Sequence, residues 1–200
     1  ELLTRVAQRH QTISLEKMQV YADDAVRVLR PHQVPNEDRL STALHLAARA
    51  RVQNGDYAGG ERLYRESIAE LHKSAPIPQV AVLQALVSLA ESLAAQQKFD
   101  QAVATYREAA DGARKYLGPG DPGVIVAESR LAALLHAIGE RTEARRLHEQ
   151  ALHTALAQKG DADTLFTPIA RMDYGRSLFA EGRIAEAADL IARVNASNRV

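Results

Sequence analysis

The order of small, large apolar and polar positions along this chain repeats at a nearly constant interval. Four segments share the pattern, and their first residues lie 42, 42 and 43 positions apart: Gly55–Ile68, Gln97–Ala110, Gly139–Leu152 and Gly182–Asn195. Apolar residues recur at helical spacing both in these segments and in the stretches that precede them. A period of this length predicts stacked helical hairpins.

Proline, glycine and capping residues set the expected helix boundaries. Asn36, Asp56 and Asp121 are predicted N-caps. The fourth hairpin is expected to begin near Asp161 or Asp163, or to have its regular part delayed by Pro168 so that Thr167 is the cap. The expected helices cover about 14–30, 36–53, 56–74, 79–96, 99–117, 121–138, 139–158, 167–182 and 184–196. The fold class predicted from this pattern is all-α.

We expect one domain over residues 1–200, because no low-complexity linker interrupts the series. It comprises a degenerate or truncated unit at 1–35 and repeats at about 36–77, 78–119, 120–160 and 161–198. The N-terminal sequence ELLTRVAQRH has neither an initiator Met nor an apolar signal segment, so we interpret the chain as a fragment of a longer protein.

Small residues recur where two helices of a hairpin would cross closely. Three columns hold them: Ala48, Ala90, Ala132 and Gly175; Gly60, Ala102, Ala144 and Ala187; Ser67, Ala109, Ala151 and Val194. Large residues fill neighbouring columns, one of which reads Tyr64, Tyr106, His148 and Ile191, and another Tyr57, Phe99, Arg141 and Ile184.

This pattern resembles the tetratricopeptide repeat, which has small residues at its eighth, twentieth and twenty-seventh positions, over about residues 36–198. The 42-residue period and the Gly118–Pro122 loop are similar to the kinesin light chain subtype, although the loop lacks that subtype's histidine. Arg141 and His148 stand at positions that are usually aromatic, and Arg51 stands where leucine is common. These departures are expected to weaken the third and first hairpins.

The resemblance implies a right-handed α-α superhelix whose concave wall is built from the first helix of each hairpin. Arg49 and Arg176 would hold a carboxylate of a peptide through paired hydrogen bonds, or each would pair with a nearby Glu instead. The family's sixth position, often asparagine in this subtype, reads Leu46, Ser88, Arg130 and Asp173 here. The predicted peptide-binding residues are His45, Arg49, Gln84, Glu91, His136, Met172, Arg176 and Phe179.

Composition supports helices and argues against several partners. Thirty-six alanines supply much of the 46% hydrophobic content, and alanine is the best helix former. The 25 basic and 25 acidic residues cancel, so we expect no nucleic-acid partner. The longest uncharged run, residues 74–90, contains two prolines and is shorter than the roughly 20 apolar residues of a membrane span.

No segment carries a recognisable catalytic or metal-binding pattern. His148 and His153 are five residues apart, whereas a zinc protease helix needs a spacing of four. Gly118–Pro119–Gly120 lacks the lysine ending of a phosphate-binding loop, and we interpret Asp23–Asp24 as a solvated helix face. There are no cysteines. We therefore expect no enzyme activity, no metal and no cofactor.

The function that follows is that of an interaction scaffold, which binds a peptide segment, a partner protein or another domain of its own chain. The alternative is a ligand-responsive module of a bacterial signalling protein, such as a kinase, a transcription regulator or a peptide-pheromone receptor, and we expect a cytoplasmic location. Leu190, Ile191 and Val194 should give the last helix a partly apolar outer face, which another domain or a second copy would cover.

Overall fold

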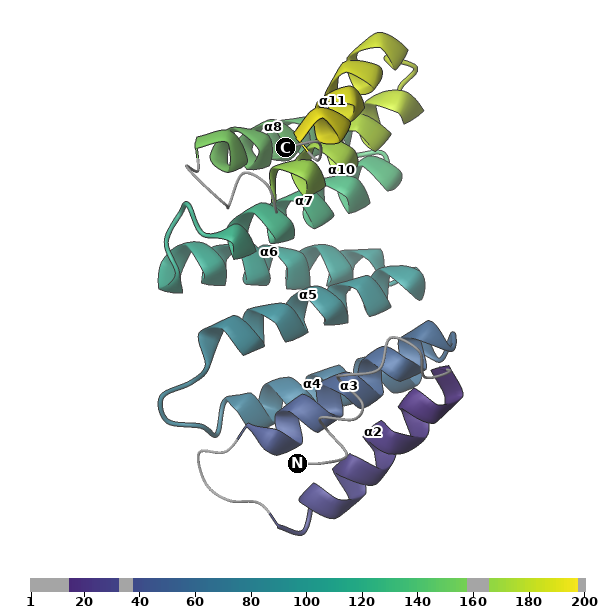
Figure 1. The fold of residues 1–200 in the computed structure, drawn as a ribbon, viewed down its shortest axis with the longest axis vertical. Helices are drawn as coiled ribbons and strands as arrows, with labels where there is room; N and C mark the ends of the chain where they lie inside the picture. Colours follow the sequence, from purple (N-terminus) through teal and green to yellow (C-terminus); the bar gives the residue numbers. More distant parts are fainter. Residues whose placement is uncertain (1–14, 33–37, 158–165, 198–200) are drawn as a thin grey trace. The chain divides into compact units, whose positions relative to one another are not determined.

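The computed structural model describes residues 15–32, 38–157 and 166–197, and every regular element in these ranges is an α-helix (Figure 1). The all-α fold of stacked hairpins predicted from the period is therefore confirmed. The helices are α2 (Leu15–Leu29), α3 (Arg39–Gln53), α4 (Tyr57–Leu71), α5 (Gln79–Ala95), α6 (Phe99–Tyr116), α7 (Pro122–Ala137), α8 (Arg141–Ala157), α10 (Thr167–Ala180) and α11 (Ile184–Ser197).

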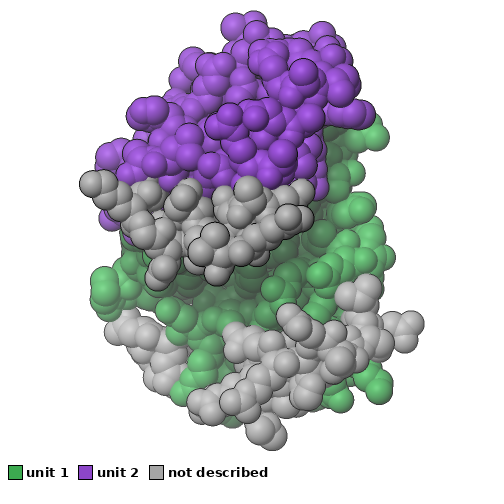
Figure 2. Space-filling view, turned by 45° about the horizontal axis from the view of Figure 1, so that its top comes forward, with its two compact units in different colours: residues 1–102 green, residues 103–200 purple. Residues whose placement is uncertain are grey.

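The chain divides into two compact units, residues 1–102 and 103–200, with the boundary inside α6 (Figure 2). In unit 1, α2 packs on α3, α3 and α4 form a hairpin, and α5 packs on α4 and touches α3. In unit 2, the hairpin of α7 and α8 packs against α10, which pairs with α11. The single-domain organisation expected from the sequence stays a prediction.

Two of the predicted N-caps are confirmed. The Asp56 carboxylate accepts a hydrogen bond from the Gly59 amide at 2.8 Å, and Asp121 accepts one from Gly123 at 2.7 Å. The prediction for Thr167 was wrong, because this residue is the first of α10 and is fully buried rather than exposed at the cap. The predicted Asn36 cap and the 158–165 boundary lie outside the described residues.

The columns of small residues mark close crossings between the helices of a hairpin. Ala48 on α3 and Gly60 on α4 are buried. A Cβ atom added to Gly60 would lie 3.2 Å from the Ala48 carbonyl oxygen and 2.4 Å from Cγ2 of Val52. In unit 2, a Cβ on Gly175 would lie 3.1 Å from Cγ1 of Ile191 on α11. The small side chains are thus what allows these backbones to approach.

The last helix presents a smaller apolar face than its sequence predicts. Val194 is buried inside unit 2, and Leu190 and Ile191 are half-buried. The most exposed large hydrophobic side chains of this hairpin are Phe179, at 63%, and Ile184, at 53%. Self-association through α11 stays a prediction, and these two residues are the better candidates for a covered face.

The first helix of each hairpin ends in the same turn. The residue two positions past the helix has a positive φ: 83° at Gly55, 61° at Gln97, 96° at Gly139 and 79° at Gly182. The next amide donates to the carbonyl five residues back, as in Lys98 to Leu93 at 3.0 Å, which is the Schellman motif. Gln97 is the one non-glycine residue with positive φ among the described residues.

Replacing Gln97 by glycine is expected to stabilise the protein. The left-handed conformation costs a side-chain-bearing residue about 1–2 kcal/mol, and the greater freedom of glycine in the unfolded chain offsets roughly half of the gain. We expect a net increase of about 0.5–1 kcal/mol, measured by urea unfolding followed by circular dichroism. The matched change Gly139→Gln should lower the free energy of unfolding by a similar amount. If both substitutions changed the stability in the same direction, this account of the turn would be contradicted.

Candidate functional site

Four of the predicted peptide-binding residues lie in unit 1, on the first helices α3 and α5. Arg49, Gln84 and Glu91 are exposed, whereas His45 is half-buried. Gln84 precedes Glu91 by seven residues on α5, which places both on the same face of the helix. The helices α3 and α5 are in contact, and we call these four residues the unit 1 inner face, after the concave wall that the family resemblance predicts.

Tyr64, from α4, lies beneath the unit 1 inner face. Its phenol hydrogen-bonds with Ser88 and is within electrostatic range of Glu91 and Arg49. Burial raises the pKa of Tyr64 to about 12, so the phenol stays protonated. The structure thus brings Arg49 and Glu91 together around a neutral hydroxyl group, although the sequence pattern assigned Tyr64 only a packing role.

His45 packs edge-on against Tyr64, with ring centroids 5.1 Å apart and an interplanar angle of 64°. Burial and, secondarily, the positive charge of Arg49 lower the pKa of His45. The imidazole is therefore mainly neutral at pH 7, and it contributes a hydrogen-bonding group rather than a charge to the inner face.

The other four predicted residues lie in unit 2. Met172 is half-buried, Phe179 is 63% exposed and Arg176 is exposed on α10. Arg176 lies 3.8 Å from the Asp173 carboxylate one turn away, so its acidic neighbour is an Asp rather than the Glu that the sequence analysis offered as an alternative. His136 on α7 is largely buried, with Nε2 3.5 Å from Glu181, whose carboxylate also pairs with Arg145 at 2.9 Å. Of these four side chains, those of Arg176 and Phe179 are the ones exposed to solvent.

The structure reveals an ion pair with one buried partner, Asp173, that the sequence analysis did not predict. Arg130 on α7 and Asp173 on α10, which occupy the sixth position of adjacent repeats, lie 3.6 Å apart. Burial raises the pKa of the Asp173 carboxyl, although Arg130 and Arg176 oppose the shift. The signal was present as opposite charges in one repeat column, where the family often places asparagine.

Two further ion pairs join consecutive helices, α2 with α3 and α6 with α7. Arg51 donates two hydrogen bonds to Asp23, at 2.6 and 3.0 Å, so the interpretation of Asp23 as part of a solvated face was wrong. Arg114 donates to Glu128, whose side chain is fully buried. Burial raises the pKa of the Glu128 carboxyl, although Arg114 opposes the shift. No spacing within one helix indicates either pair.

His148 is buried in unit 2 at the position where the repeat usually has an aromatic residue. Its ring stacks on Tyr174 at 5.1 Å between centroids, and its Nε2 lies 2.9 Å from the Ser177 hydroxyl. The Ser177 hydroxyl donates to the Asp173 carbonyl, which leaves the Nε2–H of His148 as the donor to Ser177. Burial lowers the pKa of His148 to about 4. The imidazole therefore acts as a neutral aromatic ring at pH 7.

Paired helices with close small-residue crossings define this chain as a helical-repeat protein. Tetratricopeptide repeat models match residues 81–157 and 168–193, together just over half of the chain. The chain belongs to the tetratricopeptide repeat family, which confirms the resemblance drawn from the sequence. A comparison with curated proteins found no match.

Solved structures with low sequence identity share the fold. BtubC (BKLC) from P. vanneervenii has a TM-score of 0.79 at 17% identity, over 98% of this chain and 78% of that chain. A putative kinesin light chain with TPR-like repeats from Podosopora anserina has a TM-score of 0.75 at 20% identity, over 98% and 93%. Aspartyl phosphate phosphatase F from Bacillus subtilis has a TM-score of 0.70 at 11% identity, over 99% and 59%. The hairpin architecture is thus that of kinesin light chain-like repeats.

The described residues show neither a metal-binding cluster nor a membrane-spanning helix. Within residues 15–32, 38–157 and 166–197, no group of three or more His, Asp or Glu side chains is arranged to hold a metal ion. None of the helices in the same ranges is both long and apolar enough to cross a membrane.

The lowered pKa of His148 predicts a loss of stability in acid. Its folded pKa of about 4 lies below the unfolded value of 6.5, so its contribution is intact above pH 6.5 and is lost as the pH falls toward 4. Over that range wild type should lose roughly 2–3 kcal/mol more than His148→Phe. The comparison with the variant is needed because Glu128 and Asp173, with raised pKa values, act with the opposite sign. If wild type and His148→Phe lost the same stability between pH 7.5 and pH 4.5, as measured by urea unfolding, the lowered pKa of His148 would be refuted.

Proposed function

We propose that this chain is a protein-interaction scaffold that binds a peptide segment of a partner, or of its own full-length protein, on the first helices of its repeats. The observation that carries the proposal is the unit 1 inner face, where exposed Arg49 and Glu91 converge on Tyr64. Repeat arrays of this family commonly use such surfaces to bind partners. The face offers a cation, an anion and neutral hydrogen-bonding groups within one short stretch.

The chemistry of this face selects for a particular peptide. Arg49 would receive a carboxylate through two parallel hydrogen bonds, since its side chain has no ion-pair partner among the described residues. The neutral ring of His45 and the hydroxyl of Tyr64 would serve main-chain or polar groups next to that carboxylate. An acidic residue in an extended or helical segment is therefore the expected recognition element.

Unit 2 offers a second set of contacts with a different character. The exposed ring of Phe179 and the half-buried Met172 provide apolar contact area on α10, with Arg176 on the same helix. Because Asp173 partly compensates the charge of Arg176, we expect this surface to contribute a hydrophobic anchor more than a charge. A partner with a hydrophobic anchor would use this unit 2 surface.

A regulatory module in a signalling protein is the second candidate. The observation that favours it is the similarity to aspartyl phosphate phosphatase F, in which the match covers 59% of that chain. In that protein a similar array of helices therefore occurs together with further sequence. The complete gene is the test of this alternative: an adjoining kinase or DNA-binding domain would support regulation, and repeats alone would support a scaffold.

Charge reversal of the inner-face arginine tests the proposal. Peptides selected from a phage-displayed library of random dodecamers would be measured by calorimetry against wild type, Arg49→Glu and Arg176→Glu. We expect Arg49→Glu to weaken binding at least tenfold, about 1.4 kcal/mol, because a buried arginine–carboxylate contact is replaced by repulsion. Arg176→Glu should weaken it less.

The matched control is Arg65→Glu on α4, a second helix of a hairpin, where the arginine is similarly exposed and, within the part of the chain that the structure describes, pairs with Glu61 and Gln101. This variant should bind the selected peptides as wild type does, and circular dichroism should show unchanged helicity in all three variants. Unaltered affinity in Arg49→Glu would show that another surface binds the peptide.

A further inference from the structure

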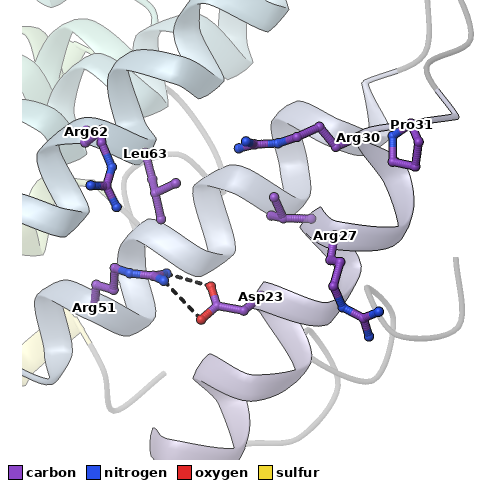
Figure 3. Close-up of a pocket in the computed structure, with 8 residues that line it drawn as sticks. Asp23, Arg27, Arg30, Pro31, Arg51, Arg62 and Leu63 are labelled. Carbon is purple, nitrogen blue, oxygen red and sulfur yellow. Dashed lines mark hydrogen bonds and ion pairs between the residues drawn. The ribbon is translucent and has the colours of Figure 1, made fainter.

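A separate pocket of about 710 Å3 opens between α2, α3 and α4 of unit 1 (Figure 3). Its lining residues are Asp23, Val26, Arg27, Arg30, Pro31, Arg51, Arg62 and Leu63. Four of the eight are arginines, although the chain as a whole carries no net charge. The inner-face residues Arg49 and Glu91 are not among them, so the pocket is distinct from the surface proposed above.

The base of the pocket is apolar and its edge is cationic. Val26 and Leu63 are buried beneath it, whereas Arg27, Arg30 and Arg62 are exposed around it. Arg30 extends from the end of α2 toward Arg62 and Leu63 on α4 (Figure 3). A site with this layout matches a ligand that has an anionic group next to a hydrophobic group.

The arginines differ in how firmly they are held. Arg51 is 18% exposed and is fixed by the two hydrogen bonds to Asp23, so it forms a rigid side of the pocket. Arg30 pairs with Glu66 at 2.6 Å, but both side chains are substantially exposed, and such pairs are worth about 0–1 kcal/mol. Arg27 pairs with Asp24 at 2.8 Å in the same exposed manner.

Arg62 is the available cation of the group. Among the residues that the structure describes it has neither a hydrogen bond nor an ion pair, and it stands at the edge of the pocket with Arg30. Two guanidinium groups on different helices, one unpaired and one in a weak exposed pair, can both turn toward an incoming oxyanion. Arginine binds carboxylate and phosphate through two parallel hydrogen bonds.

We propose that this pocket binds an acidic peptide, with a carboxylate or phosphate between Arg30 and Arg62 and a neighbouring hydrophobic side chain over Val26 and Leu63. The volume suits a few side chains rather than an extended polyanion. The carboxylates of Asp23, Asp24 and Glu66 pair with arginines of this pocket. Because these carboxylates would repel a large anion, we expect the pocket to prefer a compact anion that displaces only the Arg30–Glu66 pair.

The test uses an acidic peptide and its neutral counterpart, together with a phosphorylated version, all three labelled with fluorescein and measured by fluorescence anisotropy at 50 mM and 150 mM salt. The acidic peptide has the sequence Gly-Asp-Leu-Glu-Leu-Asp-Gly, and the neutral one has Asn and Gln in place of the acidic residues. A third version carries phosphoserine in place of the central Glu, which separates phosphate from carboxylate as the preferred source of the anion. Binding of either acidic version, but not of the neutral one, is the expected result.

Four variants locate the binding. Arg62→Gln should weaken binding about 5-fold and Arg30→Gln with Arg62→Gln about 30-fold, as expected when one and two charge-assisted contacts are lost. Glu66→Gln should strengthen binding about 3-fold, because it releases Arg30 from its partner. The control Arg65→Gln, on the same helix but outside the pocket, should bind as wild type does.

Arg49→Glu should also leave this binding unchanged, which distinguishes the pocket from the inner face: either proposal can fail while the other stands. Three results would overturn the pocket proposal. The first is equal binding of the neutral and acidic peptides, and the second is wild-type affinity in the double variant. The third is displacement of the acidic peptide by inorganic phosphate at a concentration equal to the Kd of the peptide, which would show a site for a free anion.

Discussion

The close crossing of the two helices in each hairpin is the contact on which the rest of the structure depends. At Ala48 and Gly60 there is no room for a larger side chain, since an added Cβ atom would press on a backbone oxygen and on Val52. Once this crossing fixes the rotation of both helices, the faces that point toward neighbouring repeats are fixed as well. Arg49 on α3 is then exposed, and Tyr64 on α4 is buried under α5's polar side chains.

Periodicity was enough to predict the helices, their turns and the small-residue crossings, because these depend on short-range spacing and on one repeated contact. The family resemblance, rather than the period, placed Arg49, Gln84 and Phe179 on a binding wall, and the three side chains are exposed. Periodicity could not predict which charges meet, because the pairs Arg51–Asp23 and Arg114–Glu128 join different helices through side chains of several rotamers. The pocket of unit 1 was missed for the same reason, since it requires α2, α3 and α4 together.

Two residues that depart from the family pattern, Arg141 and His148, affect the stability of the third hairpin less than a charged or polar residue at an aromatic position would suggest. Arg141 replaces an aromatic residue, but its column is exposed in the structure, with Tyr57 and Phe99 at 37% and 38%, so no buried charge results. His148 is fully buried as a neutral ring that stacks on Tyr174 and hydrogen-bonds with Ser177 through Nε2, while its buried Nδ1 has no hydrogen-bond partner among the described residues. The sequence expectation that both residues weaken the third hairpin therefore holds for His148 only in acid, where protonation would place a charge in the core.

Contacts between successive second helices show how the repeat period also organises the polar surface. Arg65 reaches Gln101 on α6 at 3.4 Å in unit 1, and Arg107 reaches Glu143 on α8 at 3.0 Å in unit 2. Both pairs are 36 residues apart, and the second is the first moved by one period of 42 residues. Arg30–Glu66 has the same separation. The contacts are exposed and individually weak, but a one-turn slip of a helix would break each of them, so they favour the register that the small-residue crossings impose. The Arg30–Glu66 pair is therefore the first, along the sequence, of these exposed contacts, and it is not part of the core. A ligand of the unit 1 pocket would have to displace this pair.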